Sequence, residues 1–150
     1  MKKFKFSLQK LLEYKEQLLD GEKNLLNLLQ HERNLLDKHI HSLKNMYNIS
    51  RSDFKSISEK GATILQLQVQ QDKIRDIQRK IEEAIKNLSL QDKKIEQQTK
   101  VIVSLNTEIS SLNKLKEKQL AEYNYKVQKA DELLIEEFVS NTTASGSLSE

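Results

Sequence analysis

Hydrophobic residues recur at every seventh position over a long stretch of the chain that begins at residue 67. The position is aliphatic without exception across the series Leu67, Ile74, Ile81, Leu88, Ile95, Ile102 and Ile109. A seven-residue repeat held this long is typical of an α-helix that supercoils around a partner helix. Apolar residues continue to Phe138 at less regular spacing, so we predict a helix over about residues 64–138.

A second apolar stripe runs from about residue 4 to residue 58, and it is rich in adjacent leucines. Adjacent leucines widen the apolar face of a helix beyond the narrow seam that one partner helix covers. Gly21 should cost about 1 kcal/mol relative to alanine, but the leucines resume in phase after it. We therefore predict one continuous helix here.

The two patterns are separated by a short segment with reversal signals. Serines crowd residues 50–58, and Lys60-Gly61 follows them. A glycine just after a lysine in the last turn favours a helix end, and Thr63 is of a residue type that caps the start of a helix. We predict a tip at about residues 59–63.

These elements predict an all-α fold in which two long helices form an antiparallel coiled-coil hairpin. About a tip at Gly61, residue i should face a residue near 122 − i, which places Phe4 beside residues 117–120. Residues 121–138 should then extend beyond the first helix with exposed apolar side chains, and such surfaces usually mark a binding site.

Residues 139–150 differ from the rest of the chain. They are mostly serine, threonine, asparagine and glycine, without an apolar period. Such a segment cannot bury enough apolar surface to fold. We therefore predict a disordered tail after a hairpin of residues 1–138.

Glutamines stand in the second helix at several positions where the other apolar residue of each heptad is expected. They are Gln70, Gln91, Gln98 and Gln119. Buried polar groups in a coiled coil can set the register of its helices, at a cost in stability. We favour the simpler interpretation, in which these glutamines are half exposed in a loosely packed pair.

The composition agrees with long helices rather than with a layered domain. Charged residues make up 31% of the chain and aromatic residues 5%, and proline, cysteine and tryptophan are absent. This profile is typical of coiled coils, and it excludes disulfides and thiolate chemistry. The net charge of +3 is small, which argues against a nucleic-acid partner. No segment approaches the roughly 20 apolar residues that span a bilayer, so we expect no insertion into a membrane.

No catalytic or metal-binding motif is recognisable in the chain. His31 lacks a second histidine one turn later, where Leu35 stands, and His39 and His41 point to different sides of a helix. Two helices also offer no dry cleft in which the pKa of a carboxylate would be raised for acid–base catalysis. We therefore expect no enzymatic activity, no metal and no cofactor.

The N-terminal sequence resembles that of one known family. Residues 4–16 read FKFSLQKLLEYKE, an aromatic-basic-aromatic triplet followed by a leucine-rich stretch. This is similar to the start of FliJ, a flagellar export protein. The total length, a glycine near position 60, a long second helix and a short tail also resemble that family.

The resemblance implies a non-enzymatic accessory of the flagellar type III export machine, active in motility and chemotaxis. It implies a coiled-coil stalk that binds the hexameric export ATPase and promotes its assembly and activity, and that also contacts the export gate membrane protein and export chaperones. It further implies a cytoplasmic protein, a monomer when alone, that lies at the cytoplasmic face of the cell membrane when assembled. The ATPase-binding residues would lie where the two termini meet: Phe4, Phe6, Leu8, Leu11, Leu12, Tyr123, Val127, Leu134 and Phe138.

The start of the second helix departs from the family pattern. Relatives often have aromatic residues there, where this chain has Gln70 and Lys73. If such aromatics contact the export gate, the contact is made differently here. The residues that we expect at this contact are Tyr47, Phe54, Ile74 and Ile77.

Two other functions fit the same sequence. A passive structural or tethering coiled coil, self-associated into dimers or bundles, would explain the broad leucine face of the first helix. A stalk of a virulence type III secretion system would share the mechanism of the flagellar one.

Overall fold

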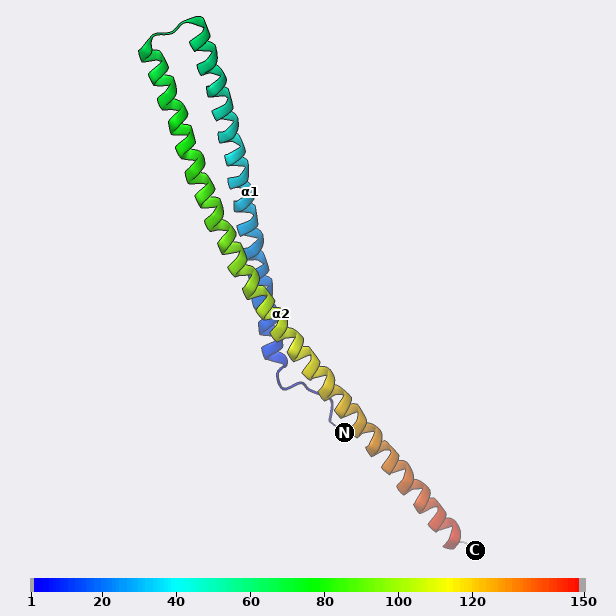
Figure 1. The fold of residues 1–150 in the computed structure, drawn as a ribbon. Coiled ribbons are helices and arrows are strands. Elements are labelled where there is room, and N and C mark those ends of the chain that lie inside the picture. Colours follow the sequence, from blue (N-terminus) through cyan, green and yellow to red (C-terminus); the bar gives the residue numbers. More distant parts are fainter. Residues whose placement is uncertain (1, 149–150) are drawn as a thin grey trace. The chain divides into compact units, whose positions relative to one another are not determined.

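A computed structural model describes residues 2–148, with side chains through residue 146. It contains two α-helices, α1 (Gln9–Lys60) and α2 (Ile64–Leu148), and no strand within this range (Figure 1). The two helices pack against each other in antiparallel directions, which confirms the predicted helical hairpin. Gly21 lies inside α1, so the first helix is continuous, as predicted.

Residues 61–63 form the tip between the helices, inside the predicted range. Gly61 has a φ angle of 85°, the left-handed conformation that commonly ends a helix and that glycine adopts without steric cost. The hydroxyl oxygen of Thr63 accepts a hydrogen bond from the amide of Gln66 at 3.2 Å, and the Gln66 side chain accepts one from the amide of Thr63 at 3.1 Å. This reciprocal pair is a capping box, so Thr63 caps α2, as predicted.

The first helix begins later than the sequence predicts. α1 starts at Gln9 rather than at about residue 4, and residues 2–6 form a non-helical arm. Phe6 is 7% exposed, and Phe4 is half-buried. Residues two apart share one side of an extended chain but not of a helix. Leaving the helical conformation therefore allows both phenylalanines to be covered.

The second helix continues past its predicted end. The tail predicted over residues 139–150 is wrong for residues 139–148, which are helical; residues 149–150 lie outside the described part. Extending an existing helix is far easier than starting one, and the chain has no proline that would end it. Two threonine hydroxyls donate to carbonyl oxygens one turn earlier, Thr142 to Phe138 at 2.8 Å and Thr143 to Val139 at 2.9 Å.

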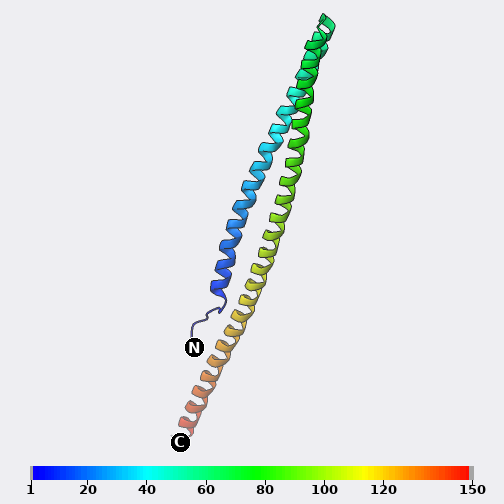
Figure 2. The same ribbon diagram turned by 90° about the vertical axis from the view of Figure 1, so that its left-hand side faces the viewer.

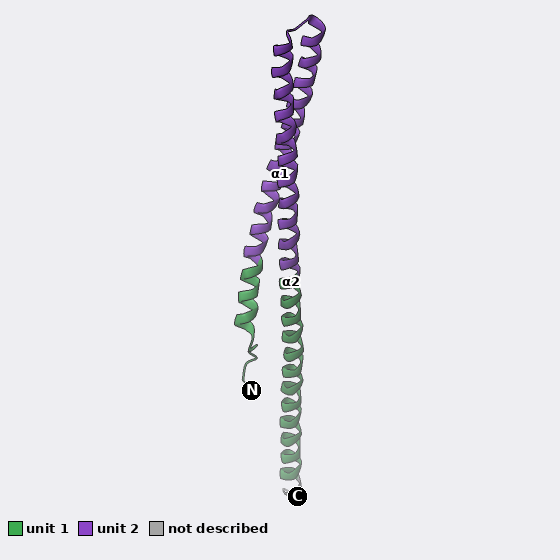
Figure 3. Ribbon diagram, turned by 60° about the vertical axis from the view of Figure 1, so that its left-hand side comes forward, with its two compact units in different colours: residues 1–19, 104–150 green, residues 20–103 purple. Residues whose placement is uncertain are grey.

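The chain divides into two compact units, each built from parts of both helices (Figure 3). Unit 1 comprises Met1–Leu19 and Ser104–Glu150, and unit 2 comprises Asp20–Val103. In unit 1, Lys15 forms a salt bridge with Glu108 at 2.7 Å. The predicted register places residue 107 opposite Lys15, so it holds here to within one residue.

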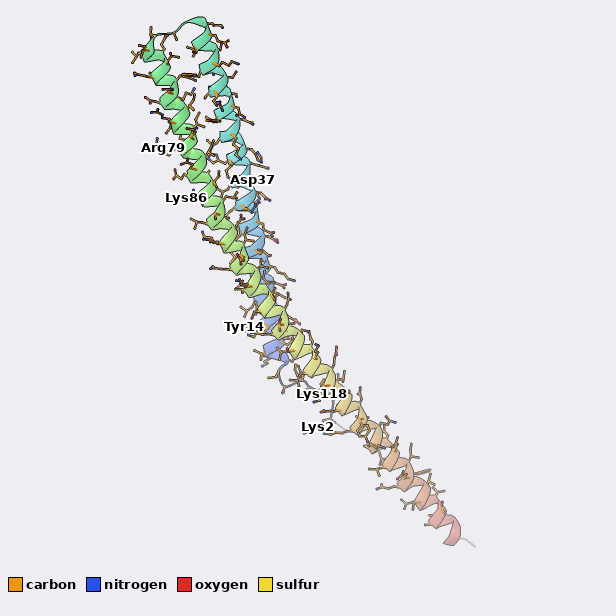
Figure 4. All side chains as sticks on the ribbon, viewed as in Figure 1. Lys2, Tyr14, Asp37, Arg79, Lys86 and Lys118 are labelled. Carbon is orange, nitrogen blue, oxygen red and sulfur yellow. The ribbon has the colours of Figure 1, made fainter. Side chains whose placement is uncertain are left out.

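Unit 2 contains the predicted heptad seam, in which α1 and α2 lie side by side (Figures 1 and 2). Along α2, the aliphatic heptad positions of residues 67–102, and the positions three residues after them, are all buried or half-buried. Along α1, residues 22–57 show the same alternating spacing of covered positions. Outward positions such as Arg79 and Lys86 project from α2 away from α1 (Figure 4). The buried centre of this seam consists of Ile40, Leu43 and Ala84, with Ile81 and Leu88 packed against it.

Glutamines of α2 bridge the seam to main-chain carbonyl oxygens of α1. Gln91 is 6% exposed and Gln98 is 8% exposed, so the interpretation that these glutamines are half exposed is wrong for these two. It holds for Gln70 and Gln119, which are half-buried. The side-chain amides donate as follows: Gln70 to Ser50 at 3.2 Å, Gln91 to Leu29 at 3.0 Å and Gln98 to Glu22 at 3.0 Å. Because each amide finds an acceptor, the seam can bury these polar groups.

Candidate partner-binding surfaces

The non-helical arm packs against α2 in unit 1. The ring centroids of Phe4 and Tyr123 lie 5.6 Å apart, with 47° between the ring planes, a separation at which aromatic rings attract each other. The Tyr123 hydroxyl donates a hydrogen bond to the carbonyl oxygen of Lys2 at 2.6 Å. Phe4 thus lies beyond residues 117–120, its predicted neighbours, because a non-helical chain advances further per residue than a helix.

The residues predicted to bind the ATPase differ in how far they are exposed. Phe6 and Leu12 are only 7% and 3% exposed, so they stabilise the packing of unit 1 and offer little surface to a partner. The half-buried residues of the set are Phe4, Leu8, Tyr123 and Val127. The exposed residues of the set are Leu11, Leu134 and Phe138.

Residues 131–146 of α2, which we call the C-terminal segment, are exposed throughout. The large apolar side chains of this segment are between 55% and 72% exposed: Leu133, Leu134, Ile135, Phe138 and Val139. Four carboxylates are interspersed with them, those of Asp131, Glu132, Glu136 and Glu137. A helix that exposes so many apolar side chains usually binds another surface. That surface would need to complement negative charge.

The arm has the opposite charge. Its exposed basic residues, with one from the first turns of α1, are Lys2, Lys3, Lys5 and Lys10. A shallow groove in unit 1 runs beside Phe4 and Phe6 and is bounded by Lys10 and Lys116. Unit 1 therefore presents a basic surface around the arm and an acidic, apolar surface on the C-terminal segment.

Three of the four residues expected at the export gate line one groove of unit 2. The groove contains Tyr47, Phe54 and Ile74, together with Arg51, Arg75 and Gln78. The Arg51 guanidinium carbon lies 5.7 Å from the centroid of the Tyr47 ring, a distance at which a cation is attracted to an aromatic face. The Tyr47 hydroxyl accepts a hydrogen bond from Gln78 at 3.2 Å. Ile77 is 4% exposed and packs in the seam, so it does not line this groove.

Ion pairs join α1 to α2 and lie along the outside of α2 in unit 2. Arg33 Nε donates to the carboxylate of Asp92 on the other helix at 2.6 Å, and this hydrogen bond raises the pKa of Arg33. On the outside of α2, hydrogen bonds from Arg79 and then Lys80 lower the pKa of Asp76. Both pKa shifts favour the charged form of the group, as an opposite charge nearby does.

Clusters of metal-ligating side chains and membrane-spanning helices are both absent from the part of the chain that the structure describes. No group of three or more histidine, aspartate or glutamate side chains there is arranged to hold a metal ion. None of the described helical residues make up a span that is long and apolar enough to cross a membrane.

Several exposed apolar residues were not among the predicted contacts. Leu133 and Ile135 adjoin the predicted Leu134 within the helix expected over residues 64–138, and Val139 follows Phe138 because α2 continues past its predicted end. On α1, the exposed apolar residues outside the seam of unit 2 are Leu25, Leu28, Leu35, Met46 and Ile49. The feature of the sequence that points to these exposed residues is the broad leucine face predicted for the first helix.

A family model described as Flagellar FliJ protein matches residues 4–146 of the chain. The matched range includes most of the arm, the whole of α1 and the entire C-terminal segment. Comparisons with curated proteins and with solved structures found no significant match.

Proposed function

Because the chain belongs to the flagellar FliJ family, which is a family of flagellar protein export, we propose that it is a non-enzymatic accessory that binds the hexameric export ATPase and promotes its assembly and activity. The observation that carries this proposal is the C-terminal segment, with its row of large, exposed apolar side chains. The flagellar description of the family favours this role over that of a virulence-system stalk.

The proposed contact surface is centred on Leu134 and Phe138. These are 64% and 72% exposed, so binding would remove much apolar area from water and be favourable for that reason. The carboxylates of Glu136 and Glu137 lie beside them, and basic groups on the ATPase would complement their charge. The half-buried Val127 extends the same surface toward the arm.

The proposed mechanism follows from a mismatch of symmetry. A pair of helices has no six-fold axis, so it cannot contact the six subunits of a ring equally. Subunits that contact the helices would be stabilised in one nucleotide state relative to the others, because a ligand shifts an equilibrium by its differential affinity for the states. Successive contacts would then favour successive subunits.

Two further partners belong to the same proposal. The export gate membrane protein would bind the groove that contains Tyr47, Phe54 and Ile74, where aromatic, aliphatic and guanidinium groups meet. Export chaperones are the other expected partners. Binding to these components would hold a cytoplasmic protein at the cytoplasmic face of the cell membrane.

The test uses the purified export ATPase with the full chain. The double variant Leu134→Glu/Phe138→Glu should lose at least about tenfold in affinity for the ATPase and fail to raise its turnover or ring formation. Both residues are exposed, and glutamate is a good helix former, so the variant should keep its helical content. Leu90→Glu is the matched control, because Leu90 is 57% exposed on the same helix but in unit 2. Equal stimulation by the double variant, or none by the wild type, contradicts the proposal.

A passive tethering coiled coil is the second candidate function. It is favoured by the exposed apolar residues of α1 outside the seam, which suit association with another helix. A tether would leave the turnover of the ATPase unchanged at every concentration. The ATPase assay therefore separates the two functions.

A further inference from the structure

α1 carries a second apolar stripe outside the seam of unit 2. It consists of five side chains that are between 42% and 61% exposed: Leu25, Leu28, Leu35, Met46 and Ile49. Leu25 and Met46 occupy one position of the heptad, and the other three occupy the position three residues later. This spacing is that of a coiled-coil seam, so the stripe has the form of a contact surface for one more helix.

The stripe is continuous with the buried core of unit 2. Met46 lines a groove between the helices together with Leu43 of α1 and Ala84 of α2, and Leu43 and Ala84 belong to the core. Because alanine is small, α2 leaves the groove open at this point. The remaining residues that line the groove are Leu36, His39, Lys80, Glu83 and Asn87.

The pattern of the stripe is nearly the same when it is read in either direction from Asp37. Four pairs of stripe positions lie equally many residues before and after Asp37. In three of the four pairs, both residues are apolar or both are polar. The apolar pairs are Leu25 with Ile49 and Leu28 with Met46, the polar pair is Glu32 with Ser42, and the mixed pair is Leu35 with His39. Two copies of α1 that run in opposite directions would bring the members of each pair into contact.

We propose that this stripe binds the same stripe of a second copy of the chain, with the two α1 helices antiparallel about a two-fold axis near residue 37. An isologous contact of this kind requires a self-complementary surface, which the matched pairs provide. A parallel arrangement would place Glu32 against Glu32 of the second copy, and like charges in a helix contact are unfavourable. The antiparallel arrangement places Glu32 beside Ser42 instead. This dimer departs from the monomer that the family resemblance implies, and it does not depend on binding to an export ATPase.

Sedimentation velocity of the full chain tests whether the dimer forms. The mass should rise with concentration from that of the 17.5 kDa monomer toward twice that value. A chain that stays monomeric at its highest soluble concentration contradicts the proposal, and would leave the stripe to a different protein.

A charge exchange within one chain tests the register. Leu28→Glu and Met46→Lys, each alone, should weaken dimerisation at least about tenfold, because each places a charge against an apolar side chain. The double variant Leu28→Glu/Met46→Lys should recover much of the loss, since each glutamate then meets a lysine of the second copy. Positions 28 and 46 are about 27 Å apart along one helix, so they cannot pair within a chain.

Ile85→Glu serves as the control for this series, because Ile85 is 46% exposed on α2 and lies outside the stripe. It should leave the dimer unchanged, and circular dichroism should confirm equal helicity for all variants. Recovery in the double variant supports the antiparallel register. A double variant no better than either single one, or equal weakening by Ile85→Glu, overturns it.

Thiol cross-linking tests the direction of the helices, since the natural chain has no cysteine. Lys38→Cys places a thiol near the proposed axis, so a short bis-maleimide should join two copies. Asn24→Cys lies far from the axis and should not cross-link to itself, whereas a parallel dimer would join it readily. Ready cross-linking of Asn24→Cys, which a parallel dimer would give for both variants, or no cross-linking of Lys38→Cys contradicts the antiparallel dimer.

Discussion

The part of α2 that forms the seam of unit 2 and the C-terminal segment of α2 differ in which side chains are buried. In the seam even a polar residue is covered, and Gln91 is 6% exposed, whereas in the C-terminal segment Phe138 is 72% exposed. Within unit 2, α1 lies along α2 and covers one side of it. Residues 131–146 have no such cover. The difference indicates that packing holds the seam together, while the C-terminal segment exists as a continuation of α2 whose apolar side chains remain available to a partner.

The largest effect is expected from removing a buried leucine of the seam. Leu43→Ala should lower the free energy of unfolding by about 2–3 kcal/mol, because it removes buried methyl groups and leaves a cavity. Leu134→Ala removes the same atoms from the C-terminal segment, where the side chain is 64% exposed, and should change stability by less than about 0.5 kcal/mol. Urea unfolding followed by circular dichroism measures both. Comparable losses for the two variants would mean that the C-terminal segment is packed in solution.

Replacing a buried glutamine of the seam tests whether its hydrogen bonds contribute more to stability than apolar burial at the same position would. Gln91→Leu should raise the free energy of unfolding by about 1 kcal/mol, because leucine gains apolar burial while the Leu29 carbonyl stays within its helix. The Glu32 carboxylate, which also accepts from Gln91, returns to water. The same urea experiment measures the gain. Gln97→Leu, at an exposed position of α2, is the control and should change little. A loss of stability in Gln91→Leu would mean that the hydrogen bonds outweigh apolar burial.

Much of the fold was predictable from the sequence because its signals are local and repeated. The heptads of α2 predicted the seam, and Gly61 and Thr63 predicted the tip. Both signals depend on residues that lie close together in the chain. The burial of Gln91 and Gln98 was not predictable in the same way. It depends on carbonyl oxygens of α1 lying opposite each amide, and no single-helix pattern contains that information.

The two ends of the chain show where local signals fail. The leucines after Phe6 suggested a helix from about residue 4, but contacts with α2, such as that of Phe4 with Tyr123, accompany a non-helical arm. At the other end, polar composition suggested disorder where α2 simply continues. The same holds for the predicted contact residues, because the burial of Phe6 and Leu12 depends on long-range packing that no local pattern contains.

Glycine substitutions extend the comparison from side chains to the backbone. Gly61→Ala should lower the free energy of unfolding by about 1–2 kcal/mol, because a left-handed φ is unfavourable for alanine and the two helices of unit 2 meet at this turn. Gly146→Ala in the C-terminal segment should instead leave global unfolding unchanged and slightly raise helicity, since its φ is not positive and alanine favours helix. Thermal unfolding and circular dichroism report both effects. A destabilising Gly146→Ala would contradict the view that this segment is a simple continuation of α2.

The smallest effect is expected from an ion pair on the outer side of the seam. Arg79 and Lys80 lower the pKa of Asp76, so their contribution to stability is present above the usual pKa of an aspartate and is lost as the pH falls through the lowered value. Asp76→Asn should therefore be slightly less stable than the wild type at pH 7.

The difference between Asp76→Asn and the wild type should disappear in strongly acidic solution, once Asp76 is protonated in the folded chain. Thermal unfolding of both proteins across a pH series measures it. The effect should also shrink in high salt, because exposed ion pairs are screened. Leu43→Ala serves as the contrast, since the contribution of a buried leucine does not titrate. A gap between Asp76→Asn and the wild type that stayed constant with pH and salt would mean that Asp76 acts through packing rather than charge. The outer surface of the seam would then be stabilised by packing, as its core is, and would differ in this from the C-terminal segment.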